Sequence, residues 1–274
     1  KWRYIMENDI HIQSIYGVKM PWMIYGTAWK KENTTKLVIE AVKNGFRGID
    51  TAGQPKHYRE DLVGVALQTL YEQGFKREDV YLQTKYTPLP GQDPNAIPYD
   101  KNSPIEDQVR QSFKNSIKNL QTSYVDTFIL HTAIADHVIL MKVWETMQSV
   151  QKEGGALQLG ISNCYDLEIL QKLYNDAQIK PAVVQNRFYH QTKYDKVLRQ
   201  WCDSKGIIYQ SFWSLTANPH ILQNKVLMLI AQKYNKTLEQ IFFRYLSLCG
   251  IVPLTGTCSS AHMKEDLAIL DFIL

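Results

Sequence analysis

The sequence is poor in cysteine and has no long apolar run. Only four of its 274 residues are cysteines, and they are far apart without any C-x-x-C spacing. This spacing argues against a disulfide framework and a zinc site, so we expect no bound metal and a reducing, cytoplasmic location. Apolar runs stay short of membrane-spanning length, and the N-terminus lacks the shape of a secretory signal. We therefore expect no membrane association.

An excess of charge of one sign is also absent. The formal net charge is +4, and residues of both signs are scattered throughout, without the basic stripe that binds nucleic acid. Two phosphate-binding signatures are missing as well. No G-x-G-x-x-G follows an early apolar run, which argues against a dinucleotide-binding doubly wound sheet. No G-x-x-x-x-G-K-[ST] loop occurs either. Because the basic stripe is absent, we expect no nucleic acid partner.

The chain does contain eight short apolar runs that alternate with helix-like patterns. Hydrophobic residues make up 45% of the sequence, enough for one sizeable domain, expected over residues 1–274. The runs lie at 21–26, 46–50, 80–85, 125–131, 157–162, 182–185, 207–212 and 251–254. The helical patterns lie at 33–44, 58–73, 104–119, 136–152, 166–177, 192–204, 220–234, 237–248 and 259–270. This order predicts an α/β fold, a (β/α)8 TIM barrel, with a doubly wound sheet as the competing fold.

Two further segments lie outside this alternation. Residues 10–20 alternate in polarity and turn at Gly17, which predicts a short N-terminal β-hairpin. Residues 88–104 contain five prolines and form a long irregular stretch. A loop of this length inside a compact domain is usually functional or mobile.

Several of the apolar runs end in polar residues. Asp50, Lys85 and His131 end the second, third and fourth runs, and Gln185 ends the sixth. A single residue of this kind is usually a cap, and Asp50 alone could cap a turn while Tyr58 packs at a helix start. In a barrel, however, all these positions meet at one mouth, where active sites lie. The set therefore predicts an active site.

The chemistry open to this set is proton transfer beside a cationic lysine. Tyr58 has an ordinary pKa of about 10 and would be a better acid near neutral pH if that pKa were lowered. We expect the Lys85 ammonium to lower it and Asp50 to keep Lys85 charged and oriented. His131 would donate a hydrogen bond to a carbonyl oxygen or relay a proton.

These motifs together resemble the aldo-keto reductase family. The resemblance extends over nearly the whole chain, through GVKMP, YGTAWK, GFRGIDTA with YREDLVG, VYLQTKY, VDTFILH, LGISN, KPAVVQNRFYH, SKGIIYQSFWSL and IVPLTGT. It implies a barrel, a nicotinamide cofactor bound without a Rossmann fold, and reversible reduction of aldehydes or ketones. The family's catalytic aspartate, tyrosine, lysine and histidine would fall on Asp50, Tyr58, Lys85 and His131.

The position of the tyrosine departs from the family pattern. The family usually places it five residues after the aspartate, where this chain has Pro55. Tyr58 is preferred because YREDLVG matches the family's tyrosine with its acidic pair and VG, which implies three extra residues at 54–56. His57 is a second candidate for proton transfer, although a solvated loop histidine is the simpler interpretation.

The resemblance also implies a set of cofactor-binding residues. Ser162, Asn163 and Gln185 would hold the carboxamide, and Phe212 would stack on the nicotinamide, with Tyr209 interpreted as a barrel side chain. The remaining positions are Gly26, Thr27 and Asp50 near the catalytic centre, Leu215 and Thr216 along the pyrophosphate, and Thr255 and His262 at the adenosine end.

Some departures bear on the cofactor and the substrate. A lysine and an arginine that commonly bind the 2′-phosphate of NADPH are replaced by Leu254 and His262, and Lys264 is the candidate substitute. NADPH is therefore the expected cofactor, with NADH as the alternative. Thr132 replaces a frequent tryptophan in the substrate pocket. Trp29 and Trp213 are candidates for the pocket or for the core, and the 88–104 loop for closing the pocket.

The leading hypothesis is an NAD(P)H-dependent reductase acting on a small carbonyl substrate, with the proton supplied by Tyr58. The alternative is a cofactor-binding regulatory or redox-sensing protein with little turnover, because fold alone does not fix function. A purely structural barrel is the third interpretation, and it would not require Asp50, Lys85 and His131 together. A monomer is expected from the family, and the sequence does not identify the substrate.

Overall fold

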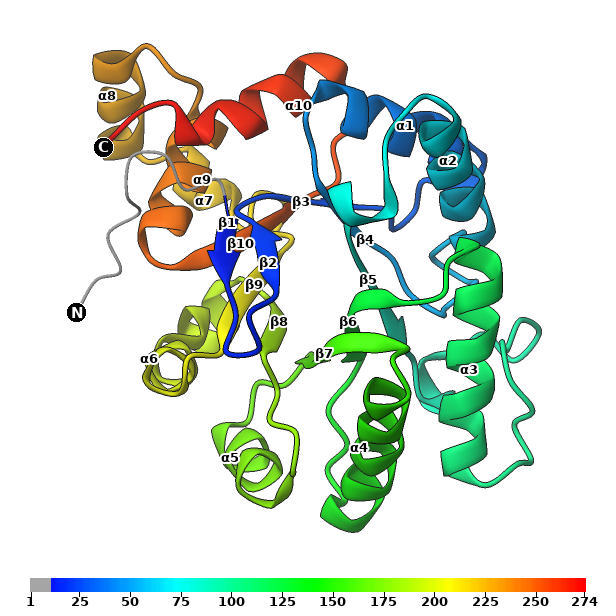
Figure 1. Ribbon diagram of the computed structural model, residues 1–274. Helices are drawn as coiled ribbons and strands as arrows, with labels where there is room; N and C mark the ends of the chain where they lie inside the picture. The colour runs from blue at the N-terminus through cyan, green and yellow to red at the C-terminus, as the bar shows by residue number, and fades with distance from the viewer. Residues whose placement is uncertain (1–10) are drawn as a thin grey trace.

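The computed structural model describes residues 11–274 and closes eight parallel strands into a barrel (Figure 1). The order around the barrel is β10-β3-β4-β5-β6-β7-β8-β9, so the first and last strands are neighbours. The barrel strands are β3 Ile24–Gly26, β4 Gly48–Asp50, β5 Tyr81–Tyr86, β6 Val125–Leu130, β7 Ala156–Ser162, β8 Val183–Arg187, β9 Ile208–Phe212 and β10 Ile251–Thr255. The predicted (β/α)8 barrel is confirmed, and the doubly wound sheet is excluded.

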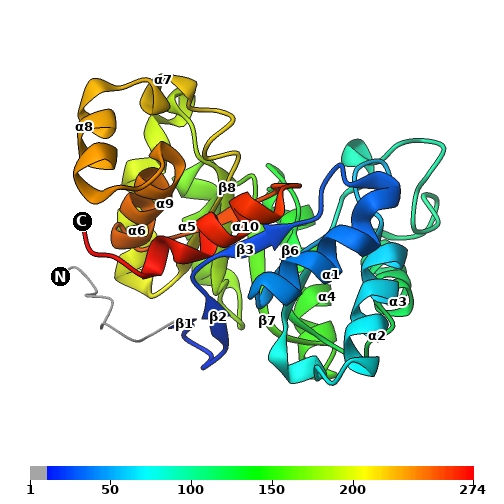
Figure 2. The same ribbon diagram turned by 90° about the horizontal axis from the view of Figure 1, so that it is seen from above.

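Helices surround the strands, and most of them bury one apolar face. Helix α1, for example, buries Leu37, Val38 and Ala41 and ends at Gly45, whose positive φ of 118° favours glycine. The helices are α1 Thr34–Asn44, α2 Glu60–Glu72, α3 Ile105–Leu120, α4 His137–Lys152, α5 Leu167–Asp176, α6 Lys196–Lys205, α7 Pro219–Leu222, α8 Lys225–Tyr234, α9 Leu238–Leu248 and α10 Ser260–Leu267. Figure 2 shows α1 to α4 on one side of the strands and α6 to α9 on the other.

A hairpin closes one end of the barrel. Strands β1 (His11–Gln13) and β2 (Lys19–Pro21) pair antiparallel and are joined by a turn at Gly17, as predicted, while residue 10 lies outside the described part of the chain. Met20 and Trp22 pack against the first residues of the barrel strands, such as Tyr81 and Val183. The hairpin therefore covers the amino ends of the strands and leaves their carboxyl ends to form the mouth.

Two predicted helices differ from the observed ones. The segment at 192–204 is regular only from Lys196 onward, because the preceding 3₁₀ segment His190–Asp195 is kinked where Lys193 and Tyr194 adopt left-handed φ values of 53° and 56°. The segment at 220–234 is split into α7 and α8. The 88–104 stretch contains the short 3₁₀ turn Leu89–Gly91 and one isolated β-bridge between Asp93 and Ala96. Among the described helices, none is long and apolar enough to cross a membrane.

Candidate active site

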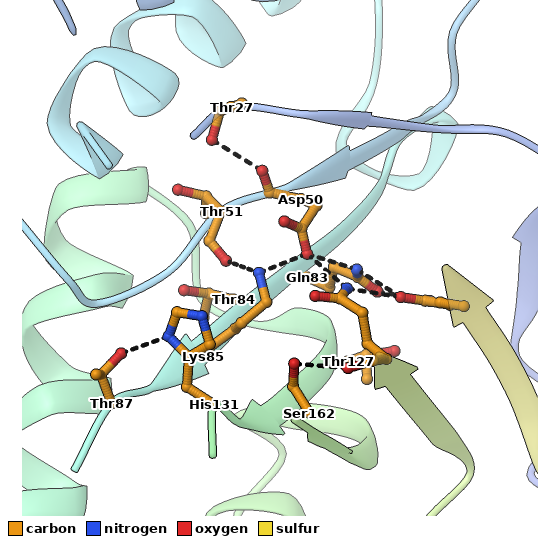
Figure 3. A network of polar contacts seen from close by, with 12 residues as sticks. Thr27, Asp50, Thr51, Gln83, Thr84, Lys85, Thr87, Thr127, His131 and Ser162 are labelled. Atoms are coloured by element: carbon orange, nitrogen blue, oxygen red, sulfur yellow. Dashed lines mark hydrogen bonds and ion pairs between the residues drawn. The ribbon is translucent and has the colours of Figure 1, made fainter. Parts of the chain in front are cut away.

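Strands β4 and β5 bring Asp50 and Lys85 into a buried ion pair. Parallel pairing sets Asp50 opposite Gln83, which places the Lys85 ammonium beside the carboxylate at 2.6 Å (Figure 3). The Lys85 side chain is 0% exposed, and its Nζ also donates to the Thr51 carbonyl at 2.8 Å. Burial lowers the pKa of Lys85, and the Asp50 charge opposes that effect. The pair is therefore rigid, desolvated and shielded from salt.

Glutamine amides inside the barrel fix the Asp50 carboxylate. Its Oδ1 accepts hydrogen bonds from Gln83 Nε2 at 2.6 Å and from Gln185 Nε2 at 3.0 Å, in addition to Lys85. Gln210 bonds both Gln83 and Gln185, and its Nε2 also lies 3.3 Å from the Met20 sulfur of the hairpin. Because these amides satisfy one another, a polar interior is stable here. Sequence reasoning missed Gln83 and Gln210, whose only signal is a polar residue within an apolar run.

A short turn places Tyr58 over this ion pair. The Gln54 carbonyl accepts from the backbone N–H groups of both His57 and Tyr58 at 3.0 Å, which closes the segment expected to contain three extra residues. The Lys85 ammonium lies 5.1 Å from the centre of the Tyr58 ring. The His131 ring lies 6.0 Å from it, centre to centre. Within residues 11–274, the Tyr58 hydroxyl has no hydrogen-bond partner, and the residue lines a cavity.

The electrostatic environment keeps Tyr58 protonated. Burial raises the pKa of Tyr58, and the Asp50 charge raises it further. The expected net lowering of this pKa is therefore wrong, because burial and the Asp50 charge outweigh the effect of the Lys85 ammonium. Burial also lowers the pKa of His131 well below its ordinary value, with a smaller contribution from Lys85. The His131 ring is thus neutral, and its Nδ1 is hydrogen-bonded to the Thr87 hydroxyl at 2.6 Å.

The second proton-transfer candidate, His57, lies beside Trp29. The two ring centres are 3.9 Å apart, and His57 Nδ1 is 3.0 Å from Gln54 Oε1. Burial lowers the pKa of His57 as well. Both His57 and Tyr58 line the cavity, but it is the Tyr58 ring that lies 5.1 Å from the Lys85 ammonium and 6.0 Å from the His131 ring.

A cavity of about 1050 Å³ connects this centre to the end of the barrel near α10. Its lining contains most of the residues predicted to act or to bind a cofactor. These are Gly26, Asp50, Tyr58, His131, Asn163, Gln185, Phe212, Leu215, Thr216, Thr255 and His262. Thr27, Lys85 and Ser162 lie just behind the wall. Thr27 donates to the Asp50 carbonyl at 2.8 Å, and Ser162 to the Gln185 carbonyl at 2.7 Å, so both position lining residues.

Asn163 has a left-handed backbone, with φ of 49°, which this residue type tolerates. Its Nδ2 donates to the His131 carbonyl at 2.9 Å, and its Oδ1 accepts from the Tyr165 hydroxyl at 3.1 Å. The amide is thereby held at one orientation in the cavity wall. Gln185, predicted to share its role, directs its amide nitrogen at Asp50 instead.

The far end of the cavity carries a cation that sequence reasoning missed. Lys30 Nζ donates to the Gly256 carbonyl, although the two residues are 226 positions apart. Leu254 and His262 line the same region, whereas the predicted substitute Lys264 is exposed and is not part of the lining. The only signal for Lys30 is its place after Trp29 in YGTAWK.

The aromatic candidates differ in location: two tryptophans line the cavity, and one tyrosine is buried in the barrel wall. Trp29 and Trp213 both line the cavity and are 56% and 47% exposed, so they belong to the pocket and not to the core. Tyr209 is buried and donates to Asp195 at 2.7 Å, which confirms its interpretation as a barrel side chain.

The start of the long loop rests on the Tyr58 turn. Gln54 Nε2 donates to the Gly91 carbonyl at 2.6 Å, and Gln92 Nε2 donates to the Gly53 carbonyl at 2.8 Å. Gly91 lines the cavity, as does Thr132. The loop therefore contributes to one rim of the site.

A parallel barrel with a buried Asp–Lys pair, a protonated tyrosine and a long cavity at its mouth defines a barrel enzyme suited to acid-assisted carbonyl chemistry. The model of the Aldo/keto reductase family matches residues 20–274, so the chain belongs to this family. It is accordingly an NAD(P)H-dependent oxidoreductase of carbonyl groups.

Known proteins agree with this assignment. Glyoxal reductase of Bacillus subtilis is 31% identical over 261 residues, covering 94% of this chain and 86% of its own. An aldo/keto reductase structure from Brucella melitensis superposes with a TM-score of 0.81 at 26% identity, covering 96% of this chain and 94% of its own. An aldo-keto reductase solved with NADPH has a TM-score of 0.80 at 22% identity, covering 96% and 84%, and shows the fold alone. These relatives do not favour the regulatory alternative.

Proposed function

We propose that this chain reduces a small aldehyde or ketone with NADPH, using Tyr58 as the proton donor. The observation that carries the assignment is the position of Tyr58, whose ring lies near both Lys85 and His131 while its hydroxyl makes no hydrogen bond to the described residues. A raised pKa keeps that hydroxyl protonated and available.

The cavity residues fit a nicotinamide dinucleotide. Phe212 offers an aromatic face, and the oriented Asn163 amide offers polar atoms for a carboxamide. At the other end, Lys30 and the start of α10 near His262 suit phosphate groups. The cofactor, when bound, supplies the hydride. Because Leu254 is apolar, we assign preference for NADPH over NADH to Lys30 and His262.

The protein's own groups then handle orientation and the proton. The Tyr58 hydroxyl donates a hydrogen bond to the carbonyl oxygen and transfers its proton as negative charge develops there. We assign neutral His131 the tautomer in which Nδ1, 2.6 Å from the Thr87 hydroxyl, accepts its hydrogen bond, so that Nε2–H is a second donor to the same oxygen. Lys85, held by Asp50, stabilises the tyrosinate that remains.

Replacement of Tyr58 by phenylalanine tests this assignment. The wild-type protein is expected to bind NADPH, followed by fluorescence, and to consume it with an activated aldehyde, followed by absorbance. Tyr58→Phe should bind NADPH equally well but lose turnover about 100-fold or more, because general acid catalysis contributes about 10² to 10⁴. His57→Gln, on the neighbouring residue, should keep most of the activity. A Tyr58→Phe variant with the wild-type rate would show that His57 or a water supplies the proton.

We propose further that residues 1–274 act as one catalytic domain and as a monomer in the cytoplasm. All four cysteines are free, and two of them, Cys164 and Cys202, are buried thiols with pKa values raised by burial. Free thiols suit a reducing compartment. Sedimentation of the purified protein tests the oligomeric state, since a stable dimer would contradict the proposal.

A further inference from the structure

One arginine in the cavity has no part in the reaction proposed above. Arg187 is the last residue of β8, two positions after Gln185 and so on the same face of the strand. It lines the cavity that contains Tyr58 and His131. In the described part of the chain, its guanidinium forms no ion pair and no hydrogen bond, and its Nε is buried without an acceptor. The hydrogen-bonding capacity of this side chain is therefore unused.

Aromatic rings hold the guanidinium in place. Its central carbon lies 4.3 Å from the centre of the Trp213 ring and 5.4 Å from that of Tyr189. Stacking of this kind orients the planar group without consuming its N–H donors. Trp213 directly follows Phe212 at the end of β9, so the stack is anchored to the barrel mouth.

A short series of contacts ties Arg187 to the reacting centre. Its backbone N–H donates to the Tyr165 hydroxyl at 3.1 Å, and that hydroxyl donates to Asn163 Oδ1 at 3.1 Å. Asn163 in turn donates to the His131 carbonyl at 2.9 Å. Arg187 therefore belongs to the wall that continues directly from His131.

No carboxylate that lines the cavity, including Glu239, Glu265 and Asp266, forms an ion pair with Arg187 among the described residues. The Asp50 carboxylate, which lines the same cavity, is already paired with Lys85 at 2.6 Å. A partly buried cation without a partner is costly, and an entering anion would remove that cost. A planar guanidinium pairs with both oxygens of a carboxylate or a phosphate.

We propose that Arg187 binds a carboxylate carried by the substrate, so that the preferred substrates are oxo acids and aldehyde acids. This inference rests on the proposed carbonyl reduction. Arg187 is a specificity-determining residue in this scheme, and the proton and hydride chemistry stays with the groups already described. A phosphate of the cofactor has the same acceptor chemistry as a substrate carboxylate, and the experiment distinguishes these two ligands of Arg187.

The test compares acids with their neutral methyl esters. Two matched pairs vary the distance between carboxylate and carbonyl: phenylglyoxylate with its methyl ester, and 4-carboxybenzaldehyde with methyl 4-formylbenzoate. In at least one pair, the wild-type kcat/KM for the acid should exceed that for the ester by about tenfold or more. Arg187→Met should abolish this preference, mainly through KM, and Arg187→Lys should recover part of it. Arg110→Gln removes the same charge from an exposed pair with Glu153 and should leave the preference unchanged.

Three results would overturn the proposal. One is an acid-to-ester ratio that is the same in Arg187→Met and wild type. Another is a wild-type kcat/KM for each acid that does not exceed the value for its methyl ester. The third is an Arg187→Met variant that binds NADPH about tenfold more weakly and reduces acid and ester equally poorly, which would assign Arg187 to a cofactor phosphate.

A binding measurement keeps the inference independent of turnover. Trp29 and Trp213 line the cavity, so tryptophan fluorescence should report binding of 4-(hydroxymethyl)benzoate and its methyl ester. Tighter binding of the acid by wild type but not by Arg187→Met supports the proposal even if no carbonyl is reduced, in which case only the proposed function fails. Equal binding of acid and ester by wild type contradicts it.

Discussion

Replacement of Glu60 by glutamine should change how the stability of the protein depends on pH. Glu60 begins α2 and is only 5% exposed. Its carboxylate accepts hydrogen bonds from the Thr84 hydroxyl and, at 2.9 Å, from the Ser116 hydroxyl. Burial raises the pKa of Glu60 from an ordinary value of 4.5 to about 7, because the two hydroxyls and the Lys85 charge only partly offset the loss of water.

The size and sign of the effect follow from this pKa. A pKa raised in the folded state means that the folded protein binds more protons than the unfolded chain between about pH 4.5 and pH 7. The stability that Glu60 contributes is therefore complete below about pH 4.5 and is lost as pH rises through about 7. One pKa unit corresponds to about 1.4 kcal/mol, so the total loss is about 3 kcal/mol.

Urea unfolding at several pH values from 5 to 8.5 measures this loss. The free energy of unfolding of Glu60→Gln, relative to wild type, should rise by about 2 to 3 kcal/mol over this range, since the amide does not ionise. The matched control is the adjacent Asp61→Asn. The Arg59 hydrogen bond lowers the pKa of Asp61, so its own dependence lies at more acidic pH. A difference between Glu60→Gln and wild type that stays constant within about 0.5 kcal/mol would refute the reasoning, because a proton bound more tightly by the folded state must make stability change with pH.

Three further substitutions test the site and the packing around it. Lys85→Met should lower turnover about 100-fold or more and cost about 3 kcal/mol of stability, with NADPH binding retained; unchanged turnover would disprove the coupling of Lys85 to the proton donor. Leu254→Lys should tighten NADPH about tenfold relative to NADH in a fluorescence titration, because it adds a cation to the phosphate end, and an equal effect on both cofactors would contradict this placement. Gly64→Ala should lower the free energy of unfolding by about 3 kcal/mol, since its new Cβ would lie 2.0 Å from the Asn119 carbonyl oxygen. Val65→Ala, on the exposed face of the same helix, is its control and should cost less than about 1 kcal/mol.

The order of the elements could be predicted because hydrophobic periodicity is a local property. Each barrel strand is a short apolar run, and each helix has a repeating apolar face. Asp50, Lys85 and His131 were predictable for a related reason, since the carboxyl ends of all strands in a barrel meet at one mouth. Tyr58 required the YREDLVG motif, because the preceding turn changes its distance from Asp50.

Other features depend on how the barrel closes and could not be read from the sequence. Lys30 reaches Gly256 only because β3 pairs with β10, which brings the first and last strands of the barrel together. Gln83 meets Gln210 across 127 positions for a similar reason. The pKa of Tyr58 moved opposite to expectation because burial of a side chain depends on everything packed around it.

The amide chain inside the barrel has a consequence for how the protein can vary. Asp50 is linked through Gln83 and Gln210 to the sulfur of Met20, so a continuous series of dipoles extends from the mouth to the plug formed by the hairpin. An apolar residue at either glutamine would leave a neighbouring amide, and finally the Asp50 carboxylate, short of a donor. The glutamines of the barrel interior are thus also the residues whose hydrogen bonds fix the Asp50 carboxylate at its mouth. An apolar substitution at Gln83 or Gln210 that improves packing would therefore also alter the hydrogen bonding of the Asp50–Lys85 pair.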